Sequence, residues 1–382
     1  MNSPTFTVLN SVNEFDVGAK ISLFGAGESG QEFAATLQRE RPDVEIVSFF
    51  DSYREGDYKG IQILNPRRIP DLDKNVEIVV TSIFWNEILD ITVNTYGRPS
   101  KILSNNLINH SSHLSSYGSF YFDIAEKPSL EARFSRIYNN FKSDLDRQIF
   151  GKIFDLRVCR EEKNFLLYMN GLVREQRSTF DNLDKYSKHL DLKSVRYAIE
   201  GGVYDGRDTS KFLGTLKKND DFKKLYAFDP FLDSLENSEF FNQIDSNYCE
   251  FIPSALWDAD EKISFDVDYS NPANSRVVRF PKDGISEYPS NAISAVTVDS
   301  FLDNINIPLD LLKLDIEGSE MNALHGAKKS IQRYRPKLAI SLYHCREHFL
   351  EIPEFILSIH PTYKFSISLT NPTFVDMVIY AQ

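Results

Sequence analysis

Two stretches of the chain alternate short apolar runs with amphipathic segments, and this alternation constrains the fold more than any other feature. The first stretch extends from Lys20 to about Ser104, and the second extends from Val195 to the end of the chain. Strands that alternate with helices form βαβ units and a parallel sheet. We therefore expect an α/β protein with two doubly wound, Rossmann-like domains.

The region between these stretches has a different pattern. Residues 129–170 carry apolar side chains at a spacing of three to four, which is the period of a helix. We predict a Rossmann-like nucleotide-binding domain at 1–105, a helical connector at 106–193 and a second α/β domain at 194–382. A partner-binding role for the connector helices is the alternative to packing against a neighbouring domain. The 382 residues leave room for two or three compact units.

Composition excludes several classes of protein. The chain has 43 Lys plus Arg against 55 Asp plus Glu, a net charge of −12, and no long cationic run, so we expect no nucleic-acid partner. No apolar stretch approaches the roughly 18 residues of a membrane helix, and the first 20 residues lack a signal-peptide pattern. We therefore predict a cytoplasmic protein without a membrane span, and homo-oligomerisation stays open. The three cysteines form no CxxC pair, so we predict no disulfide framework and no cysteine zinc site.

The first glycine turn, Gly25-Ala-Gly27-Glu-Ser-Gly30, follows a predicted strand and opens a predicted helix. Its GxGxxG spacing is typical of a turn that lets a phosphate approach the backbone at a helix N-terminus. Asp51 ends the next strand, where a carboxylate can accept hydrogen bonds from ribose hydroxyls. We predict a site for a nucleotide, either a dinucleotide or a nucleotide-sugar. The alternative is a domain that keeps these glycines for packing and binds no ligand.

The second glycine turn runs from Glu200 through Gly201 and Gly202 to Asp205. It lacks the GxGxxG spacing, so a pyrophosphate is not the expected ligand. Glu200 and Asp205 can meet an ammonium group, while Gly202 lets a ligand approach the backbone. Asp229 ends the next strand and can reach ribose hydroxyls. This pattern suits a nucleoside that carries an amino acid, and S-adenosylmethionine is such a ligand.

The segment LLKLDIEGSE places ionisable residues in a predicted buried strand. Lys313, Asp315 and Glu317 recur at period two, so we expect their side chains to point to the same side of the sheet near its carboxyl end. Buried charges are unfavourable unless they pair or serve a function. A structural ion pair of Lys313 with Asp315 or Glu317 is one alternative. A divalent cation held by Asp315 and Glu317 is another, but carboxylates in a cleft more often do acid-base or ionic work, and we assign no metal site.

Together these segments resemble the FkbM-type family of S-adenosylmethionine-dependent methyltransferases. The resemblance covers about Val195 to Gln382 and rests on KLDIEGSEMNALHGAKKSI, RPKLAISLYH, TVDSFL, EGGVYDGRDTSKF, LYAFDP and DMVIYA. It implies a class I methyltransferase fold with a seven-stranded sheet. The family more often has Asp where Glu200 stands and an Ala-Asn pair in place of Val203 and Tyr204. The N-terminal LFGAGESG and FFDS segments look like nucleotide-binding Rossmann domains found beside sugar-modifying enzymes.

The resemblance implies an S-adenosylmethionine-dependent O-methyltransferase that acts on a hydroxyl of a saccharide, glycoconjugate or related natural product. Asp315 is the expected general base, with Glu317 and His344 as rivals and Lys313 as an electrostatic neighbour. The residues expected around the cofactor are Glu200, Gly201, Gly202, Asp205, Asp229, Ser254, Ala255 and Asp315.

Two other functions remain as alternatives. One is a non-catalytic protein that binds a nucleotide or nucleotide-sugar. The other is a nicotinamide-dependent oxidoreductase that uses the N-terminal turn, although no Tyr-xxx-Lys pair accompanies it. His344-Cys-Arg-Glu-His348 also spells the HxxEH motif of zinc peptidases, which needs both histidines on one helix. Because His344 ends a predicted strand, we do not assign this activity.

Overall fold

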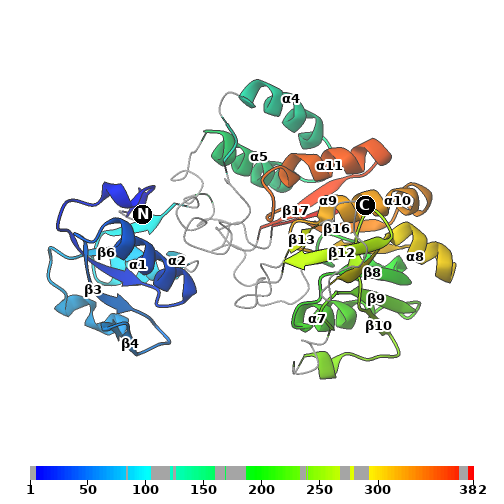
Figure 1. The fold of residues 1–382 in the computed structure, drawn as a ribbon. Helices are drawn as coiled ribbons and strands as arrows, with labels where there is room; N and C mark the ends of the chain where they lie inside the picture. Colours follow the sequence, from blue (N-terminus) through cyan, green and yellow to red (C-terminus); the bar gives the residue numbers. More distant parts are fainter. Residues whose placement is uncertain are drawn as a thin grey trace, which may run out of the picture. The chain divides into compact units, whose positions relative to one another are not determined.

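The computed structural model divides the chain into two compact units, shown as ribbons in Figure 1. The N-terminal unit comprises residues 1–124, 155–175 and 371–373, and the C-terminal unit comprises residues 125–154, 176–370 and 374–382. The structure describes residues 6–82, 85–104, 121–123, 126–159, 168, 186–232, 238, 240–266, 276–278, 292–369 and 377–382. The two units are described separately below.

The N-terminal unit contains a seven-stranded sheet in the order β1-β7-β6-β2-β3-β5-β4. Its strands are β1 (Phe6–Leu9), β2 (Lys20–Phe24), β3 (Glu45–Phe50), β4 (Gly56–Tyr58), β5 (Ile61–Leu64), β6 (Glu77–Val80) and β7 (Ser100–Leu103). Neighbouring strands are parallel except β4 and β5, which form an antiparallel hairpin. Helix α1 (Glu28–Glu40) joins β2 to β3, and α2 (Trp85–Leu89) continues into a π-helical turn, Asp90–Thr95, before β7.

Burial explains why this unit follows the predicted pattern. Ile21 and Leu23 on β2 are fully buried, as expected for a central parallel strand covered on both faces. On α1, Phe33 and Leu37 lie four residues apart on the face that is also fully buried. The apolar periodicity of the sequence therefore corresponds to one continuous core in this unit.

The C-terminal unit contains a second seven-stranded sheet, in the order β10-β9-β8-β15-β16-β18-β17. Its strands are β8 (Tyr197–Gly201), β9 (Lys224–Phe228), β10 (Cys249–Ile252), β15 (Leu311–Leu314), β16 (Lys337–Ser341), β17 (Phe365–Ser368) and β18 (Val378–Ala381). The first five strands in this order are parallel, and β18 runs antiparallel to both of its neighbours. The strand order reverses between β8 and β15. Such a reversal opens a crevice at the carboxyl ends of the strands, where ligands of α/β sheets bind.

Among the described residues, helices and a smaller sheet lie beside these strands. The helices are α7 (Arg207–Leu216), α8 (Val298–Ile305), α9 (Glu320–Gly326), α10 (Lys328–Tyr334) and α11 (His348–Ile359). The smaller sheet has the order β11-β14-β12-β13. Its strands are β11 (Ala255–Leu256), β12 (Glu261–Asp266), β13 (Arg276–Val278) and β14 (Ile293–Val296).

Two helices in the predicted connector pack onto the C-terminal unit. They are α4 (Lys127–Tyr138) and α5 (Asp144–Cys159), and α4 and α5 lie beside α11 in Figure 1. Arg133 on α4 bonds to Glu354 on α11, and the Asp146 carboxylate accepts the backbone amide of Ile367 on β17. The division between the two units falls within α5, after Phe154. The helical prediction is confirmed over these two helices, and residues 160–167 and 169–170 lie outside the described residues. The predicted boundaries at 105 and 193 stay predictions.

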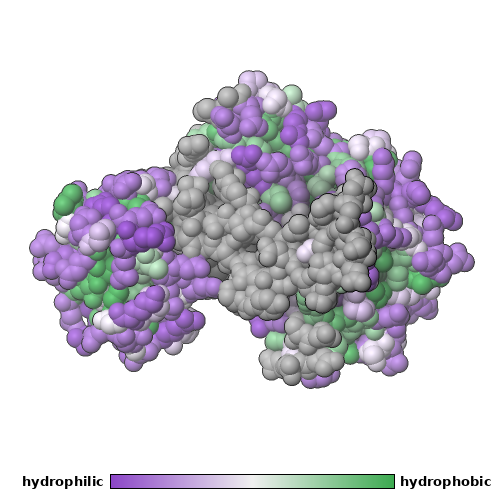
Figure 2. Space-filling model, in the orientation of Figure 1, coloured by the Kyte–Doolittle hydropathy of each residue, from purple (hydrophilic) through white to green (hydrophobic). Residues whose placement is uncertain are grey.

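The α/β class and the seven-stranded C-terminal sheet are confirmed. Strands β1 and β12 and the β4–β5 hairpin were not predicted, and β4 is largely exposed, so hydrophobic periodicity gives little sign of it. Hydrophilic residues cover most of the described surface on the face drawn in Figure 2. Among the described helices, none has the length and apolar character needed to cross a bilayer.

Candidate active site at the carboxyl edge of the C-terminal sheet

The turn after β8 approaches the loop after β15 so closely that only glycine fits at one position. Gly202 has a φ of +86°, and a Cβ at this residue would lie 1.8 Å from the backbone oxygen of Asp315. The Asp315 amide also donates a hydrogen bond of 3.0 Å to the carbonyl of Gly201. The two segments that carry the predicted site therefore meet where the strand order reverses, which is the expected ligand crevice.

Asp229 closes the same turn from the end of the neighbouring strand β9. Its Oδ2 accepts hydrogen bonds from the amides of Val203 (3.0 Å) and Tyr204 (3.2 Å), and its Oδ1 accepts one from Phe231 (2.9 Å). A carboxylate has about four lone-pair sites, so room for roughly one further hydrogen bond remains. Tyr204 itself has a φ of +54° and is 59% exposed.

The other predicted cofactor residues lie at the same edge of the sheet or just beyond it. The Asp205 carboxylate accepts the amide of Arg207 at the start of α7 (3.0 Å). Ser254 and Ala255 are buried between the end of β10 and β11, and the Ser254 amide bonds to the carbonyl of Ile252. Within this unit, the structure thus brings Gly202 and Asp315 into contact and places Asp205 at the end of their turn.

Lys313 makes a different ion pair from the one considered above. Its Nζ lies 2.5 Å from Glu200 Oε1, and the two side chains are 4% and 0% exposed. The residues are register partners on the parallel strands β15 and β8. Burial alone would lower the pKa of Lys313, but Glu200, together with Asp315 and Asp208, outweighs burial and raises this pKa, which favours the ammonium form. Burial also raises the pKa of Glu200, and the contact with Lys313 opposes that rise.

The prediction that Lys313, Asp315 and Glu317 lie on one strand is wrong. Strand β15 ends at Leu314, so Asp315 and Glu317 lie in the loop that follows it. Glu317 has a φ of +53°, and Gly318 follows with a φ of +93°. This left-handed turn ends the alternation of side chains that a continued strand would have.

Three of the predicted catalytic residues nevertheless converge. His344 Nε2 lies 3.3 Å from Glu317 Oε2 and 3.7 Å from Asp315 Oδ1. The Tyr343 hydroxyl donates to the same Asp315 oxygen at 2.9 Å. His344 is fully buried, whereas the Asp315 and Glu317 side chains are 26% and 28% exposed. The two carboxylates are therefore accessible from outside, and the imidazole lies behind them.

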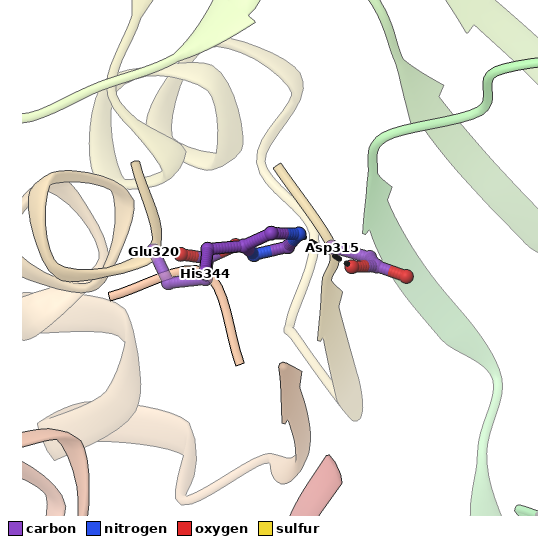
Figure 3. Close-up of side chains that lie close together, drawn as sticks. All are labelled: Asp315, Glu320 and His344. Carbon is purple, nitrogen blue, oxygen red and sulfur yellow. Dashed lines mark hydrogen bonds and ion pairs between the residues drawn. The ribbon is translucent and has the colours of Figure 1, made fainter. Parts of the chain in front are cut away.

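Behind the imidazole lies Glu320, a buried residue at the start of α9. Its Oε1 is 2.8 Å from His344 Nδ1 and accepts the amide of Ile316 at 3.0 Å, and its Oε2 is 3.2 Å from His348 Nδ1. Figure 3 shows the His344 ring between Glu320 and Asp315. The two histidines of the HxxEH motif thus meet at Glu320, with His344 just beyond β16 and His348 opening α11.

Electrostatics in this cluster favour a charged imidazole. Burial alone would lower the pKa of His344, but Glu320, together with Glu317 and Asp315, outweighs burial and raises this pKa to about 9. Burial would raise the pKa of Glu320, but the two neighbouring histidines lower it below its ordinary value. Near neutral pH, His344 is therefore an imidazolium that faces carboxylates on both sides.

These pKa shifts predict how stability depends on pH. Because the folded pKa of His344 is raised above its ordinary 6.5, its stabilisation is complete below pH 6.5 and is lost as the pH rises through about 9. The shift corresponds to about 3 kcal/mol of unfolding free energy. Because the pKa of Glu320 is lowered, its stabilisation is present above pH 4.5 and is lost as the pH falls further.

Urea unfolding at pH 6.5 and pH 9 measures the alkaline loss. The chain has two tryptophans, Trp85 in the N-terminal unit and Trp257 in the C-terminal unit. A Trp85→Phe background leaves Trp257 as the reporter of the unit that holds His344. The pKa of His348 is also raised, to about 10, so His348 contributes to the decline in the same pH range. His344→Gln should therefore reduce the alkaline decline without abolishing it, and a decline of unchanged size in this variant would assign it to other groups.

A metal ion fits this cluster poorly. Asp315, Glu320 and His344 offer ligand atoms within 4.8 Å of one another. However, Glu320 Oε1 already contacts Ile316 and His344, and the raised pKa of His344 favours a proton where a metal ligand must be deprotonated. These three residues are therefore better suited to hydrogen bonds and ion pairs with one another than to a metal ion.

Glu320 was not predicted as a functional residue, and the pairing of Glu200 with Lys313 was not predicted either. Glu200 and Lys313 are single ionisable positions in neighbouring apolar strands, each one residue before the strand end, and this shared position is the signal for their pairing. Glu320 is the last carboxylate of the KxDxEGxE pattern. Its contact with His344 depends on tertiary structure, which no local pattern indicates.

The N-terminal glycine turn is closed by a similar carboxylate. A Cβ at Gly30 would lie 1.9 Å from the Gly25 oxygen, so this glycine serves close packing, whereas a Cβ at Gly27 would meet no atom within 4 Å. Asp51 Oδ2 accepts the amide of Ala26 at 2.9 Å. The predicted nucleotide site at these residues stays a prediction.

Comparisons with known proteins agree with the C-terminal geometry. Residues 200–365 match the model of a protein family described as Methyltransferase FkbM domain. The chain also resembles the crystal structure of methyltransferase FkbM from Methylobacillus flagellatus KT. The TM-score is 0.60 and the identity 18%, over 96% of this chain and 90% of that one, so this likeness shows the fold. No curated protein matches the chain.

The matched residues 200–365 begin at Glu200, the first residue of the second glycine turn, and include Asp229, the whole Asp315–Glu320 loop and His344. The resemblance inferred from the sequence is thereby confirmed for this part of the chain. The C-terminal unit of this protein contains an FkbM-type methyltransferase domain.

Proposed function

We propose that this chain is an S-adenosylmethionine-dependent O-methyltransferase that acts on a hydroxyl of a saccharide, glycoconjugate or related natural product. The observation that carries the proposal is the contact between the Gly202 turn and Asp315 at the reversal of strand order. At this contact, a backbone segment that a ligand can approach lies next to a partly exposed carboxylate. Both belong to the methyltransferase domain.

Each part of the proposed cofactor has a counterpart at this edge. The remaining acceptor capacity of Asp229 suits a ribose hydroxyl, and the buried Ser254 and Ala255 lie further along the same edge, where the adenine is expected. Glu200 is already paired with Lys313. We therefore assign the amino-acid end of the cofactor to the Asp205 carboxylate, and we assign the Asp315 carboxylate to the acceptor.

Methyl transfer needs little machinery beyond alignment and a base. The acceptor oxygen attacks the methyl carbon, an O–C bond forms, and the S–C bond breaks with its electron pair leaving on sulfur. The hydroxyl proton passes to a carboxylate. Asp315 is the proposed base because its side chain is partly exposed, whereas His344 is buried and carries a proton near neutral pH. Glu317 is the second carboxylate within reach.

Calorimetric titration of the full chain with S-adenosylmethionine tests the cofactor. Release of S-adenosylhomocysteine with a panel of methyl glycosides and UDP-sugars tests the acceptor class. We expect Asp315→Asn to lower turnover by about 10²–10⁴-fold, since it removes the base, while cofactor affinity changes little.

Asp303→Asn, the same substitution on an exposed face of α8, should leave both quantities unchanged. Wild-type turnover in Asp315→Asn with intact cofactor binding would remove Asp315 from the chemistry. An absence of any heat of binding in the wild type would instead argue against the cofactor and favour a non-catalytic binding protein.

A nucleotide or nucleotide-sugar at the N-terminal glycine turn is a second proposal. The open space at Gly27, where the backbone can be approached, supports it. Parallel titrations with NAD and a UDP-sugar test this site and also distinguish the nicotinamide-dependent alternative. The net charge of −12 supports a small-molecule acceptor in preference to nucleic acid, and we propose a cytoplasmic location.

A further inference from the structure

We propose that Glu320 is a positioning residue of the methyl-transfer site, which holds the His344 ring so that Nε2 faces the carboxylates of Asp315 and Glu317. This inference rests on the function proposed above, and Glu320 itself does not touch the substrate. It assigns a role to a fully buried carboxylate that the transfer reaction does not otherwise use.

One oxygen of Glu320 fixes both the ring and the loop. Oε1 contacts His344 Nδ1 at 2.8 Å and accepts the amide of Ile316 at 3.0 Å. Ile316 is the residue between Asp315 and Glu317. The same Glu320 oxygen therefore fixes the position of the His344 ring and the position of the backbone that carries the two carboxylates. A hydrogen bond at one ring nitrogen sets the proton on that nitrogen and the direction of the other.

The second oxygen of Glu320 faces another imidazole. Oε2 lies 3.2 Å from His348 Nδ1, at the start of α11. Glu320 and His344 are fully buried and His348 is 5% exposed, which leaves little solvent to compensate these charges. A carboxylate that only capped a helix would lie more favourably in water. The buried arrangement is therefore better explained by the need to hold His344 in one orientation.

Backbone strain marks the same place. The described residues other than glycine with positive φ are Lys59, Tyr204, Asn306, Glu317 and Arg335. Asn306 and Arg335 end helices, and Lys59 lies in the β4–β5 turn. Tyr204 and Glu317 remain, and they follow the two central strands β8 and β15. A left-handed residue costs about 1–2 kcal/mol and persists only where its surroundings enforce it.

The contacts of Glu320 and His344 supply that enforcement for Glu317. Glu320 holds the preceding amide, and His344 Nε2 holds the Glu317 carboxylate at 3.3 Å. Asp315 and Glu317 are thereby fixed before an acceptor arrives, which reduces the cost of alignment. Two partly exposed carboxylates in fixed positions can accept hydrogen bonds from two neighbouring hydroxyls, as a saccharide offers.

The test compares Glu320→Gln with Glu354→Gln in the full chain. The second variant makes the same change at a half-buried glutamate that pairs with Arg133 and Arg136, away from the crevice. For each protein we would measure the S-adenosylmethionine dissociation constant, kcat with the methyl glycoside panel, and the His344 ring resonances in ¹⁵N-histidine-labelled protein, assigned with His344→Gln.

We expect the wild type to show a downfield Nδ1–H resonance of His344 that disappears in Glu320→Gln and remains in Glu354→Gln. We expect kcat to fall about 10²-fold in Glu320→Gln, the effect of a misplaced catalytic group, with the dissociation constant unchanged. Glu320→Asp keeps the charge but moves it back by one methylene. Its kcat should lie between that of the wild type and that of Glu320→Gln.

Several results would overturn the proposal. The first is a His344 Nδ1–H resonance that is absent in the wild type or unaffected by Glu320→Gln. The second is a loss of kcat in Glu320→Gln no greater than in Glu354→Gln. The third is that both Glu320 variants fail to fold while Glu354→Gln folds. The last result would make Glu320 purely structural. A wild type that binds no S-adenosylmethionine would refute the proposed function instead, and the resonance would still report whether Glu320 orients the ring.

Discussion

Replacing Lys313 by methionine is expected to lower the unfolding free energy of the C-terminal unit by about 3–5 kcal/mol, the cost of leaving a buried charge without its partner. Glu200 is fully buried, and its contact with Lys313 is enclosed by the central strands β8 and β15. Once the ammonium is gone, the carboxylate must lose its charge or remain unpaired. Urea unfolding followed by Trp257 in the Trp85→Phe background measures the loss.

A second substitution separates the unpaired charge from the loss of packing. The double variant Glu200→Leu with Lys313→Met replaces the pair by apolar groups and should recover most of the stability, because a buried pair and a hydrophobic pair are often nearly equal. Lys217→Met is the matched control. Its ammonium pairs with Asp245 at a partly exposed site, so its loss should stay below about 1 kcal/mol. If Lys313→Met and Lys217→Met lowered the unfolding free energy equally, the Glu200–Lys313 pair would not be a desolvated ion pair.

The fold was largely predictable because its central strands are apolar along their length. Leu311 and Leu312 are fully buried on β15, and such runs appear in the sequence without knowledge of their neighbours. Phe33 and Leu37 gave the helical period of α1 in the same way. The β4–β5 hairpin escaped prediction because its strands are short and β4 is mostly exposed, so no periodicity separates it from a loop.

The candidate site was predictable only in part, and topology explains the difference. Gly202 and Asp315 were each expected at the carboxyl end of a parallel strand, and these ends share one edge of the sheet, so their proximity could be predicted. The partner of Lys313 depends on the register between β8 and β15, which one strand alone does not specify. The contact of Glu320 with His344 depends on how α9 returns toward β16, a tertiary feature with no local signal.

Replacing Gly202 by alanine is expected to destabilise the C-terminal unit by about 3 kcal/mol, from the strain of a left-handed backbone and from overpacking. The residue has a φ of +86°, and its Cβ would lie 1.8 Å from the Asp315 oxygen. That oxygen belongs to the backbone of the loop that carries the proposed base, so the clash cannot be relieved by rotating a side chain. The turn and the loop must separate, and we expect S-adenosylmethionine binding to be lost with them.

Gly214→Ala provides the control within the same unit. Gly214 lies in α7, and an added Cβ there meets no atom within 4 Å. Alanine favours a helix interior over glycine by up to about 1 kcal/mol, so this variant should be as stable as the wild type or more so, with cofactor binding retained. Trp257 unfolding curves and calorimetric titrations of the two variants test both effects. If Gly202→Ala bound the cofactor as the wild type does, the close contact between the β8 turn and the Asp315 loop would not be what forms the site.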